Sequence, residues 1–366
     1  MTAAFSACII FCGDEGRALS AAKSALGCGI IEVPGIIEAF GIIRNKEKLR
    51  TAPRRKEHML FELTPQQRLM LLQTENECLD VVIDTDTFNE VDDQFAVAYA
   101  LLSRPRLNVE AVYAAPFFND RVISPSDGVD KSREEAQRLL ERLGDYGRVP
   151  VFDGSRQYMQ APLEPVDSPA ARDIIRRARV HTPENPLYVV GIAASTDIAS
   201  ALLMDPEIMK TTVIVWLGGN PTYWPQAREF NLSGDIYAAQ VLFDSGCALV
   251  HIPAMTVSSH LLTTLAELKK ELSGKNSLCD MLIGRFEAYS ENHFAWSKEI
   301  WDIAAIARLI CPEWVPSFLM HSPILTREHT FSQDNTRHFI LSAAFVYRNP
   351  VFCDMFTKLS SLKDGR

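Results

Sequence analysis

Short, almost continuously apolar stretches alternate with amphipathic stretches along most of the chain, and this alternation constrains the fold most strongly. The apolar stretches are typical of buried β-strands and cover residues 80–84, 109–115, 187–193, 211–217 and 248–252. Helical patterns follow several of them, at residues 92–102, 132–143, 197–204 and 235–245. Apolar strands that are separated by helices form a mainly parallel sheet covered on both faces. The sequence therefore predicts an α/β fold with a central, mostly parallel sheet flanked by helices and a Rossmann-like core.

Polar residues gather directly after four of the predicted strands. They occupy residues 84–93, 117–120, 194–197 and 218–220. In open α/β sheets the ligand binds outside the carboxyl ends of the strands, so these loops are expected to meet at one rim. The sequence therefore places a binding site at that edge of the sheet.

The first of these loops is crowded with acidic side chains. Five carboxylic residues follow the apolar run Val81–Ile83, namely Asp84, Asp86, Glu90, Asp92 and Asp93. Carboxylates this close repel one another unless a cation or protons intervene, and ligands that are all oxygen favour Ca²⁺ or Mg²⁺ over Zn²⁺. The alternative is a solvated turn in which Asp92 caps the next helix. Because capping alone does not require four aspartates in one short loop, the pattern favours a site for a hard cation.

Composition and charge narrow the class of partner. The chain has 366 residues, of which 47% are hydrophobic, enough for a substantial core. Its net charge of −9 leaves no broad basic surface for a nucleic acid polymer or an anionic membrane, so the expected partner is a small molecule. The eight cysteines show no CxxC pair, no apolar run reaches transmembrane length, and the first residues lack a basic segment typical of a secretion signal. We therefore expect reduced thiols and a cytoplasmic protein.

Four ordered motifs resemble those of the inosine-uridine preferring nucleoside hydrolase family. They are Asp84-Thr-Asp86 with Asp92-Asp93, Gly218-Gly-Asn220, Glu229-Phe-Asn231 and Trp301-Asp302-Ile-Ala. The resemblance runs from about residue 78 to the C-terminus and implies a central, mostly parallel sheet, bound Ca²⁺, hydrolysis of the N-glycosidic bond of ribonucleosides, and a homo-oligomer, either a dimer or a tetramer. We accordingly expect a nucleoside hydrolase-like catalytic domain at residues 78–366.

Residues 1–77 are expected to form an N-terminal extension and linker of unknown role. The basic run between Arg44 and Lys56 surrounds Pro53, which is typical of a solvated linker. A helical pattern over Pro65–Gln73 leads into the first strand of the catalytic domain.

The resemblance also implies a role for individual residues. Metal ligands correspond to the carboxylates of Asp86, Asp93 and Asp302 and to the backbone carbonyl of Ile192. Substrate contacts correspond to Asp92, Asn119, Glu229 and Asn231, which approach the ribose, and Trp301 is placed to stack on the base. The carboxylate that corresponds to Asp86 contacts both metal and water, which makes Asp86 the first candidate for the general base and Asp92 the second.

These residue types suit the chemistry independently of any family. Hydrolysis of an N-glycosidic bond passes through a sugar with oxocarbenium character, so the site needs anionic groups near the ring and an activated water. A Ca²⁺ ion held by several carboxylates can bind that water and two ribose hydroxyls, and it lowers the pKa of the water.

Several of these positions also have a structural interpretation. Asp302 precedes the apolar residues 303–310 and alone would equally suit a helix N-cap. Glu229 and Asn231 flank Phe230 as in a strand or turn and would otherwise be surface residues. Asp197 and Asp235 are predicted to be helix caps.

Three features depart from the family pattern. The segment Thr87–Val91 makes the acidic loop longer, which can shift Asp92 or bring Asn89 and Glu90 towards the metal. Trp301 stands where purine-cleaving members place a histidine that protonates the departing base, and indole cannot act as an acid. That proton must then come from elsewhere or from water, or be unnecessary for the true substrate.

Histidines elsewhere in the chain are the first candidates for a replacement acid. The nearest along the sequence are His260 and His293.

The third departure lies after the fourth strand, where Tyr223 or Trp224 stands near a ribose-binding asparagine of the family. Asn220 could replace that contact or only form the turn, and the two aromatic residues suggest a pocket for a ring.

Two other functions compete with hydrolysis. Asp84-Thr-Asp86 approaches the motif of haloacid dehalogenase-like phosphatases, but Phe88 breaks that motif and the downstream motifs stay unexplained. A catalytically silent protein that binds a ribosyl compound is the other alternative, motivated by Trp301. Retention of a full set of metal-site carboxylates favours the hydrolase.

Overall fold

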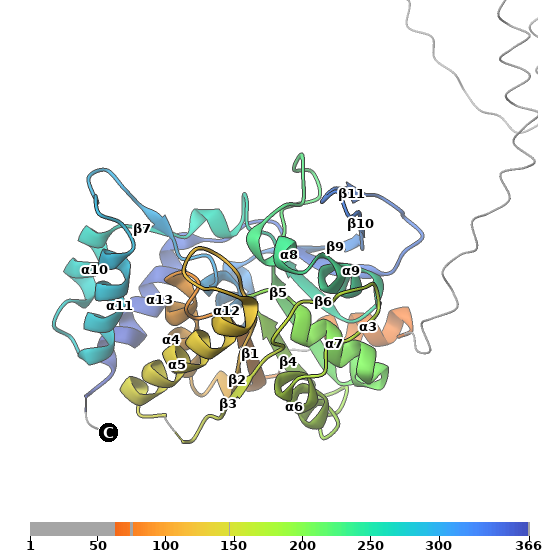
Figure 1. Cartoon of the computed structure of the whole chain (residues 1–366), viewed down its shortest axis with the longest axis horizontal. Helices are drawn as coiled ribbons and strands as arrows, with labels where there is room; N and C mark the ends of the chain where they lie inside the picture. The colour runs from red at the N-terminus through yellow and green to blue at the C-terminus, as the bar shows by residue number, and fades with distance from the viewer. Residues whose placement is uncertain (1–62, 74–75, 146, 365–366) are drawn as a thin grey trace, which may run out of the picture. The chain divides into compact units, whose positions relative to one another are not determined.

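An eight-stranded sheet forms the centre of the computed structural model, which describes residues 63–73, 76–145 and 147–364 (Figure 1). The strand order is β3-β2-β1-β4-β5-β6-β12-β9. All neighbouring strands are parallel except β12 and β9, which pair in antiparallel fashion at one edge. In chain order the strands are β1 Leu79–Thr85, β2 Leu107–Ala114, β3 Val151–Asp153, β4 Leu187–Gly191, β5 Thr212–Leu217, β6 Leu249–Ile252, β9 Ser317–His321 and β12 Phe339–Ala343. The predicted mostly parallel α/β sheet is confirmed.

Helices cover both faces of this sheet and give the chain its layered arrangement. Their bounds are α3 Pro65–Leu72, α4 Asp92–Leu101, α5 Pro125–Leu143, α6 Pro169–Ala178, α7 Thr196–Met204, α8 Phe230–Gly234, α9 Ile236–Asp244, α10 Leu265–Leu272, α11 Ser277–Ala288, α12 Ile303–Ile310 and α13 Arg348–Ser361. Helices α6, α7 and α9 pack together on one side, while α4, α5 and α10 to α13 pack together on the other (Figure 1). Within the described ranges, no helix is long and apolar enough to cross a membrane.

Short elements complete the fold around the ends of the strands. Three 3-10 helices are η2 Pro206–Lys210, η3 Ser258–His260 and η4 Pro312–Trp314. Two small antiparallel pairs join β7 Leu262–Thr263 with β8 Lys298–Glu299, and β10 Ile324–Leu325 with β11 Phe331–Ser332.

The central strands are apolar because both faces of the sheet are covered. Val81, Val82 and Ile83 of β1 are completely buried, and every residue of β5 is buried. Such strands show no alternation of polar and apolar residues, which is why they appear in the sequence as continuous apolar runs. All five predicted strands and all four predicted helices are present, with α5 beginning earlier than the pattern at 132–143.

Helix α3 confirms the helical pattern predicted for Pro65–Gln73 and packs against the sheet. Leu71 is buried, and the Arg68 guanidinium donates to the Gly246 carbonyl at 2.7 Å and to the Leu63 carbonyl at 3.1 Å. The basic run at residues 44–56 lies outside the described residues. The predicted domain boundary after residue 77 stays a prediction.

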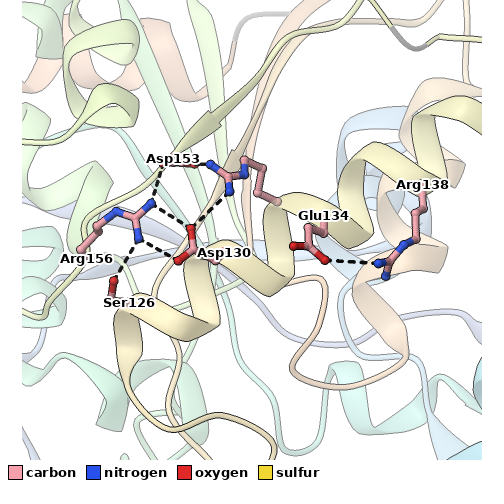
Figure 2. A network of polar contacts seen from close by, with 7 residues as sticks. Ser126, Asp130, Glu134, Arg138, Asp153 and Arg156 are labelled. Atoms are coloured by element: carbon pink, nitrogen blue, oxygen red, sulfur yellow. Dashed lines mark hydrogen bonds and ion pairs between the residues drawn. The ribbon is translucent and has the colours of Figure 1, made fainter.

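Ion pairs fasten α5 to the loop that follows β3 (Figure 2). Arg156 donates to Asp130 at 2.9 Å and to Asp153 at 2.8 Å, and Arg133 donates to the same Asp153 at 2.9 Å. Single surface ion pairs contribute little, but this network shares its carboxylates between two guanidinium groups. It holds the residues just before and after Ser155, whose amide and hydroxyl donate to Asp197 at 2.8 and 2.7 Å.

The two aspartates predicted to be helix caps have different roles. Asp235 is the N-cap of α9 and accepts from the Ala238 amide at 3.0 Å, as predicted. The prediction for Asp197 is wrong, since the N-cap of α7 is Ser195 and Asp197 lies inside the first turn. Its carboxylate instead accepts from Ser155 and from the hydroxyl of Ser168 at 2.6 Å, which ties α7 to neighbouring loops.

Candidate active site

A cavity of about 260 Å³ lies at the carboxyl ends of the parallel strands, at the rim where the sequence places a binding site. We call it the first cavity. It brings together every predicted site residue except Asn119. These residues are Asp86, Asp92, Asp93, Ile192, Glu229, Asn231, Trp301 and Asp302. They come from the ends of β1 and β4 and from the starts of α4, α8 and α12.

The end of β1 and the start of α4 are joined through the Asp93 carboxylate. One of its oxygens accepts from the Thr85 hydroxyl at 2.5 Å and from the Asp86 amide at 3.2 Å. The N-cap of α4 is Val91, so Asp92 is the first helical residue and does not serve as the cap. The strand-to-helix turn therefore directs its carboxylates into the cavity.

Three buried carboxylates form a cluster that suits a cation. Oxygens of Asp92, Asp93 and Asp302 all lie within 4.8 Å of one another. Asp86 lines the same cavity, is 1% exposed, and has one buried carboxylate oxygen without a protein partner. Buried polar atoms normally have partners, so this arrangement leaves ligand positions for an ion that prefers oxygen.

Burial and mutual repulsion make these carboxyl groups hard to ionise without a cation. Burial raises the pKa of Asp86, Asp93 and Asp302 well above the usual range, and the neighbouring carboxylates raise it further. Burial and then Glu90 raise the pKa of Asp92 to about 6. A bound divalent cation would reverse this trend because it stabilises the ionised forms.

Asp302 begins α12 but does not act as a capping residue. It occupies the N-cap position, yet its side chain makes no capping hydrogen bond. Its carboxylate lies with Asp92 and Asp93 instead. The helix-cap interpretation of Asp302 therefore does not describe what the side chain does.

Glu229 and Asn231 shape the loop on the other side of the cavity. Glu229 is the N-cap of α8, and its two oxygens accept from the amides of Asn231, Leu232 and Gly219 at 2.9, 3.1 and 2.7 Å. The Asn231 amide group donates to the Leu217 carbonyl at 3.0 Å. The expectation of a strand or turn around Phe230 is wrong, because these residues start a short helix.

The aromatic residues Tyr223 and Trp224 after β5 do not line the site. Tyr223 and Trp224 are 69% and 39% exposed, and neither lines the first cavity or the neighbouring one. The suggestion that they line a pocket for a ring is therefore wrong. Asn220 does line the first cavity, and its amide group also donates to the carbonyls of Gln226 and Arg228 at 3.1 and 3.0 Å.

A second cavity of about 590 Å³ adjoins the first. Asn89, Glu90 and Phe230 line both, so the longer acidic loop stands between them. Asn119 lines the second cavity rather than the first, and it donates to the Asn89 side chain at 2.8 Å. The structure thus places Asn119 next to the cluster of predicted residues but not within it.

The two candidate acids do not reach either cavity. The His260 ring packs at a tilt against Phe345, with 4.6 Å between ring centroids, and His293 donates to the Glu287 carbonyl at 3.0 Å. Among the residues that the structure describes, no histidine lines either cavity, although His329 contacts the lining residue Arg228 at 3.4 Å. Trp301 lines the first cavity, as the sequence predicts.

The sequence did not point to Lys298, which contacts Glu90 of the acidic loop. Its ammonium group donates to Glu90 at 2.5 Å, and the residue is 7% exposed. Burial would lower the pKa of Lys298, but Asp92 and Glu90 outweigh burial and hold the pKa above its ordinary value. A lysine three positions before Trp301 is the only signal that the sequence carries.

Known proteins resemble this chain in both sequence and fold. A family model described as inosine-uridine preferring nucleoside hydrolase matches residues 81–339. The non-specific ribonucleoside hydrolase RihC of Klebsiella pneumoniae (strain 342) is 27% identical over 261 residues, which cover 64% of this chain and 80% of that protein. RihC of Salmonella newport (strain SL254) is 25% identical over 264 residues, covering 64% and 79%.

Solved structures share the arrangement of the sheet and helices. The plant nucleoside hydrolase PpNRh1 superposes with a TM-score of 0.63 at 21% identity, covering 77% of this chain and 99% of that one. A purine-preferring ribonucleoside hydrolase from Gardnerella vaginalis gives a TM-score of 0.61 at 21% identity, covering 77% and 98%. At this level of identity the likeness concerns the fold.

Proposed function

The chain belongs to the inosine-uridine preferring nucleoside hydrolase family, and we propose that it cleaves its substrate with a water molecule activated by Ca²⁺ in the first cavity. As a member of that family it is an N-ribohydrolase, an enzyme that hydrolyses the bond between ribose and a nitrogen of the base. The observation that carries the proposal is the buried cluster of Asp92, Asp93 and Asp302, whose oxygens lie within 4.8 Å of one another.

The candidate ligands suit Ca²⁺ because all of them are oxygen atoms, and strand ends and helix starts hold them. Asp86, Asp93 and Asp302 would hold the ion, together with the carbonyl of Ile192, whose residue lines the cavity. The position of Ile192 is fixed by pairing of β1 with β4, where its amide donates to the Asp84 carbonyl at 2.9 Å. When bound, the ion would supply a water of lowered pKa and contacts to two ribose hydroxyls.

The protein side chains then divide the remaining work. Asp86 accepts the proton of the attacking water, since its free oxygen is buried in the cavity, and Asp92 is the second candidate for this step. Asp92, Glu229 and Asn231 hold the ribose hydroxyls. The anionic groups around the sugar stabilise positive charge as the bond to the base breaks.

Four further expectations stay predictions. Asn119 approaches the substrate from the second cavity, and Trp301 stacks on the base at the wall of the first. Homo-oligomeric assembly as a dimer or tetramer follows from the resemblance alone. Residence in the cytoplasm is also a prediction, and it rests on the composition of the chain.

The decisive experiment measures ribose release from a panel of purine and pyrimidine ribonucleosides. Wild type is assayed with Ca²⁺ and after chelation, beside Asp93→Asn, and binding of Ca²⁺ is followed separately by calorimetry. We expect release that needs both Ca²⁺ and Asp93. A protein that binds Ca²⁺ and ribonucleosides without releasing ribose would instead be a silent binder, and full activity in chelator would refute the metal assignment.

A further inference from the structure

We propose that the site is built for ribosyl compounds whose base already carries a positive charge before cleavage, such as an N-ribosylpyridinium. The inference rests on the N-ribohydrolase function proposed above and names its substrate class. It follows from three properties of the two cavities, namely the lack of a proton donor, an excess of carboxylates, and aromatic faces beside Glu90.

The first property is that no side chain is placed to protonate a departing base. Across the described residues that line the two cavities, histidine, lysine and cysteine are absent. Tyr289 lines the second cavity, but its hydroxyl donates to Glu90 at 3.2 Å, and burial followed by the charge of Glu90 raises its pKa. A phenol with a raised pKa is a weaker acid than a free one.

The carboxyl groups of the first cavity act as acceptors rather than donors. Four aspartates line this cavity, where Asp86, Asp93 and Asp302 would hold the cation and Asp92 a ribose hydroxyl. Both oxygens of Glu229 accept from backbone amides, and both oxygens of Glu90 accept, one from Lys298 at 2.5 Å and one from Tyr289 at 3.2 Å. Both carboxyl groups are therefore already engaged as acceptors of hydrogen bonds from the protein.

The second property is an excess of negative charge that a cationic base would balance. Eight carboxylic side chains line the two cavities, namely Asp86, Glu90, Asp92, Asp93, Asp120, Glu135, Glu229 and Asp302. Only three cationic side chains among the described residues line them, and each already has a partner. Arg285 donates to Glu135 at 2.8 and 2.7 Å, Arg121 donates to the Asn89 carbonyl at 2.8 Å, and Arg228 contacts His329. Even with one divalent ion and with Lys298 beside Glu90, carboxyl groups outnumber the positive charges at this site.

The third property is the position of Glu90 between the two cavities. It lines both, its side chain is 33% exposed, and a carboxylate oxygen can accept more than one contact. The Lys298 ammonium beside it lies 5.7 Å from the centroid of the Trp301 ring and 5.4 Å from that of Tyr289. A flat charged ring stacked on Trp301 would gain the same kind of attraction, which outweighs repulsion from Lys298 because that ammonium is already paired with Glu90.

A positively charged base also removes the need for an acid. In an N-ribosylpyridinium, the electron pair of the bond between C1′ and nitrogen moves to that nitrogen and cancels its charge. The base leaves as a neutral molecule without a proton. Water adds its oxygen to C1′ and loses one proton to Asp86, so that ribose, a neutral pyridine and one proton are formed.

The test compares kcat/KM for nicotinamide riboside with kcat/KM for uridine and inosine, using the full chain with Ca²⁺. We expect the charged substrate to be cleaved more efficiently by at least about tenfold, the change that one charge-assisted contact confers. The reduced, uncharged form of nicotinamide riboside has nearly the same shape. Its inhibition constant should be at least about tenfold higher than the dissociation constant of the charged substrate.

Variants assign the preference to Glu90. In Glu90→Gln the ratio of kcat/KM for nicotinamide riboside to that for uridine should fall by about tenfold. The matched control is Glu134→Gln, an exposed position on α5 that pairs with Arg138 at 3.2 Å and should leave the ratio as in wild type (Figure 2).

The outcomes separate the two levels of the proposal. Equal or faster cleavage of uridine or inosine would overturn the preference for a charged base while leaving the N-ribohydrolase in place. An unchanged ratio in Glu90→Gln would remove Glu90 from the explanation. Failure to release ribose from all three compounds would overturn the proposed function, and this inference with it.

Discussion

Lys298 forms an ion pair with Glu90, which lines both cavities, and 2.5 Å separates the ammonium nitrogen from a carboxylate oxygen. The lysine side chain is 9% exposed and that of Glu90 is 33% exposed. The pair joins β8, just before Trp301, to the acidic loop that follows β1. It therefore sets the position of the part of the loop that is longer than in the common family form.

Replacing the lysine should loosen this loop. Lys298→Met leaves Glu90 without its cation near Asp92, and we expect the free energy of unfolding to fall by about 2 kcal/mol, less than for a fully buried pair because Glu90 is partly solvated. Urea denaturation measures the change. The control is Lys269→Met, whose pair with Glu287 is exposed on both sides and should contribute little to stability. Equal effects of the two substitutions would contradict a special role for Lys298.

Asp302→Asn separates a metal ligand from a helix cap, because asparagine caps a helix as well as aspartate does. We expect Ca²⁺ affinity measured by calorimetry to fall by at least about 100-fold, since a charged ligand is lost. In chelator the same variant should melt at a higher temperature than wild type, since one of the mutually repelling carboxyl groups is neutralised. Asp244→Asn alters an ion pair with Arg337 in which the Asp244 side chain is exposed, and it serves as the control. Unchanged Ca²⁺ affinity would exclude Asp302 as a ligand.

The raised pKa values predict how stability depends on pH when no metal is bound. The pKa of Asp92 is raised from 3.8 to about 6, and those of Asp86, Asp93 and Asp302 are raised in the same direction. The folded protein thus binds more protons than the unfolded chain above pH 3.8, so these groups lower stability as pH rises through about 6.

Thermal melting in chelator should therefore show a lower midpoint at about pH 7 than at about pH 5, a loss on the order of 2 kcal/mol. Ca²⁺ should raise the midpoint more at the higher pH because protons no longer compete for the carboxylates. A Ca²⁺ effect that does not grow with pH would argue against carboxylate ligands.

Two glycines offer a matched test of packing around the site. A Cβ atom on Gly154 would lie 2.4 Å from an Asp197 carboxylate oxygen and 2.5 Å from the Ala114 carbonyl oxygen, so Gly154→Ala should lower the free energy of unfolding by about 3 kcal/mol. Gly284 in α11 faces open space, and Gly284→Ala should raise it by about 1 kcal/mol. Denaturation curves of both variants test the prediction, and a tolerated alanine at 154 would show that the loop after β3 adapts.

Much of the fold was predictable because its signals are local. The strands β1, β4 and β5 are covered on both faces, and strands buried in this way consist of nearly continuous apolar residues. The acidic loop was equally visible, since four aspartates between residues 84 and 93 have few other uses. Asp302 could be placed only through the resemblance, because an aspartate before an apolar helix is also a common cap.

The rest depended on contacts between distant segments. Asp197 looks like a cap in the sequence, but the loops that bring Ser155 and Ser168 to it are not encoded near it. Asn119 follows the second strand as predicted, yet the longer acidic loop places Asn89 between it and the first cavity. Lys298 carries no motif, and only its contact with Glu90 reveals what it does.

The cluster of Asp92, Asp93 and Asp302 has a consequence for how the chain is held together. Asp93 and Asp302 lie far apart along the chain, and their oxygens nevertheless lie within 4.8 Å of each other. A cation at that point would act as a cross-link that closes a very long loop, in the way a disulfide does, but reversibly. The concentration of free Ca²⁺ would then determine how strongly the segments that carry Asp93 and Asp302 are held together, as well as how fast the protein turns over substrate.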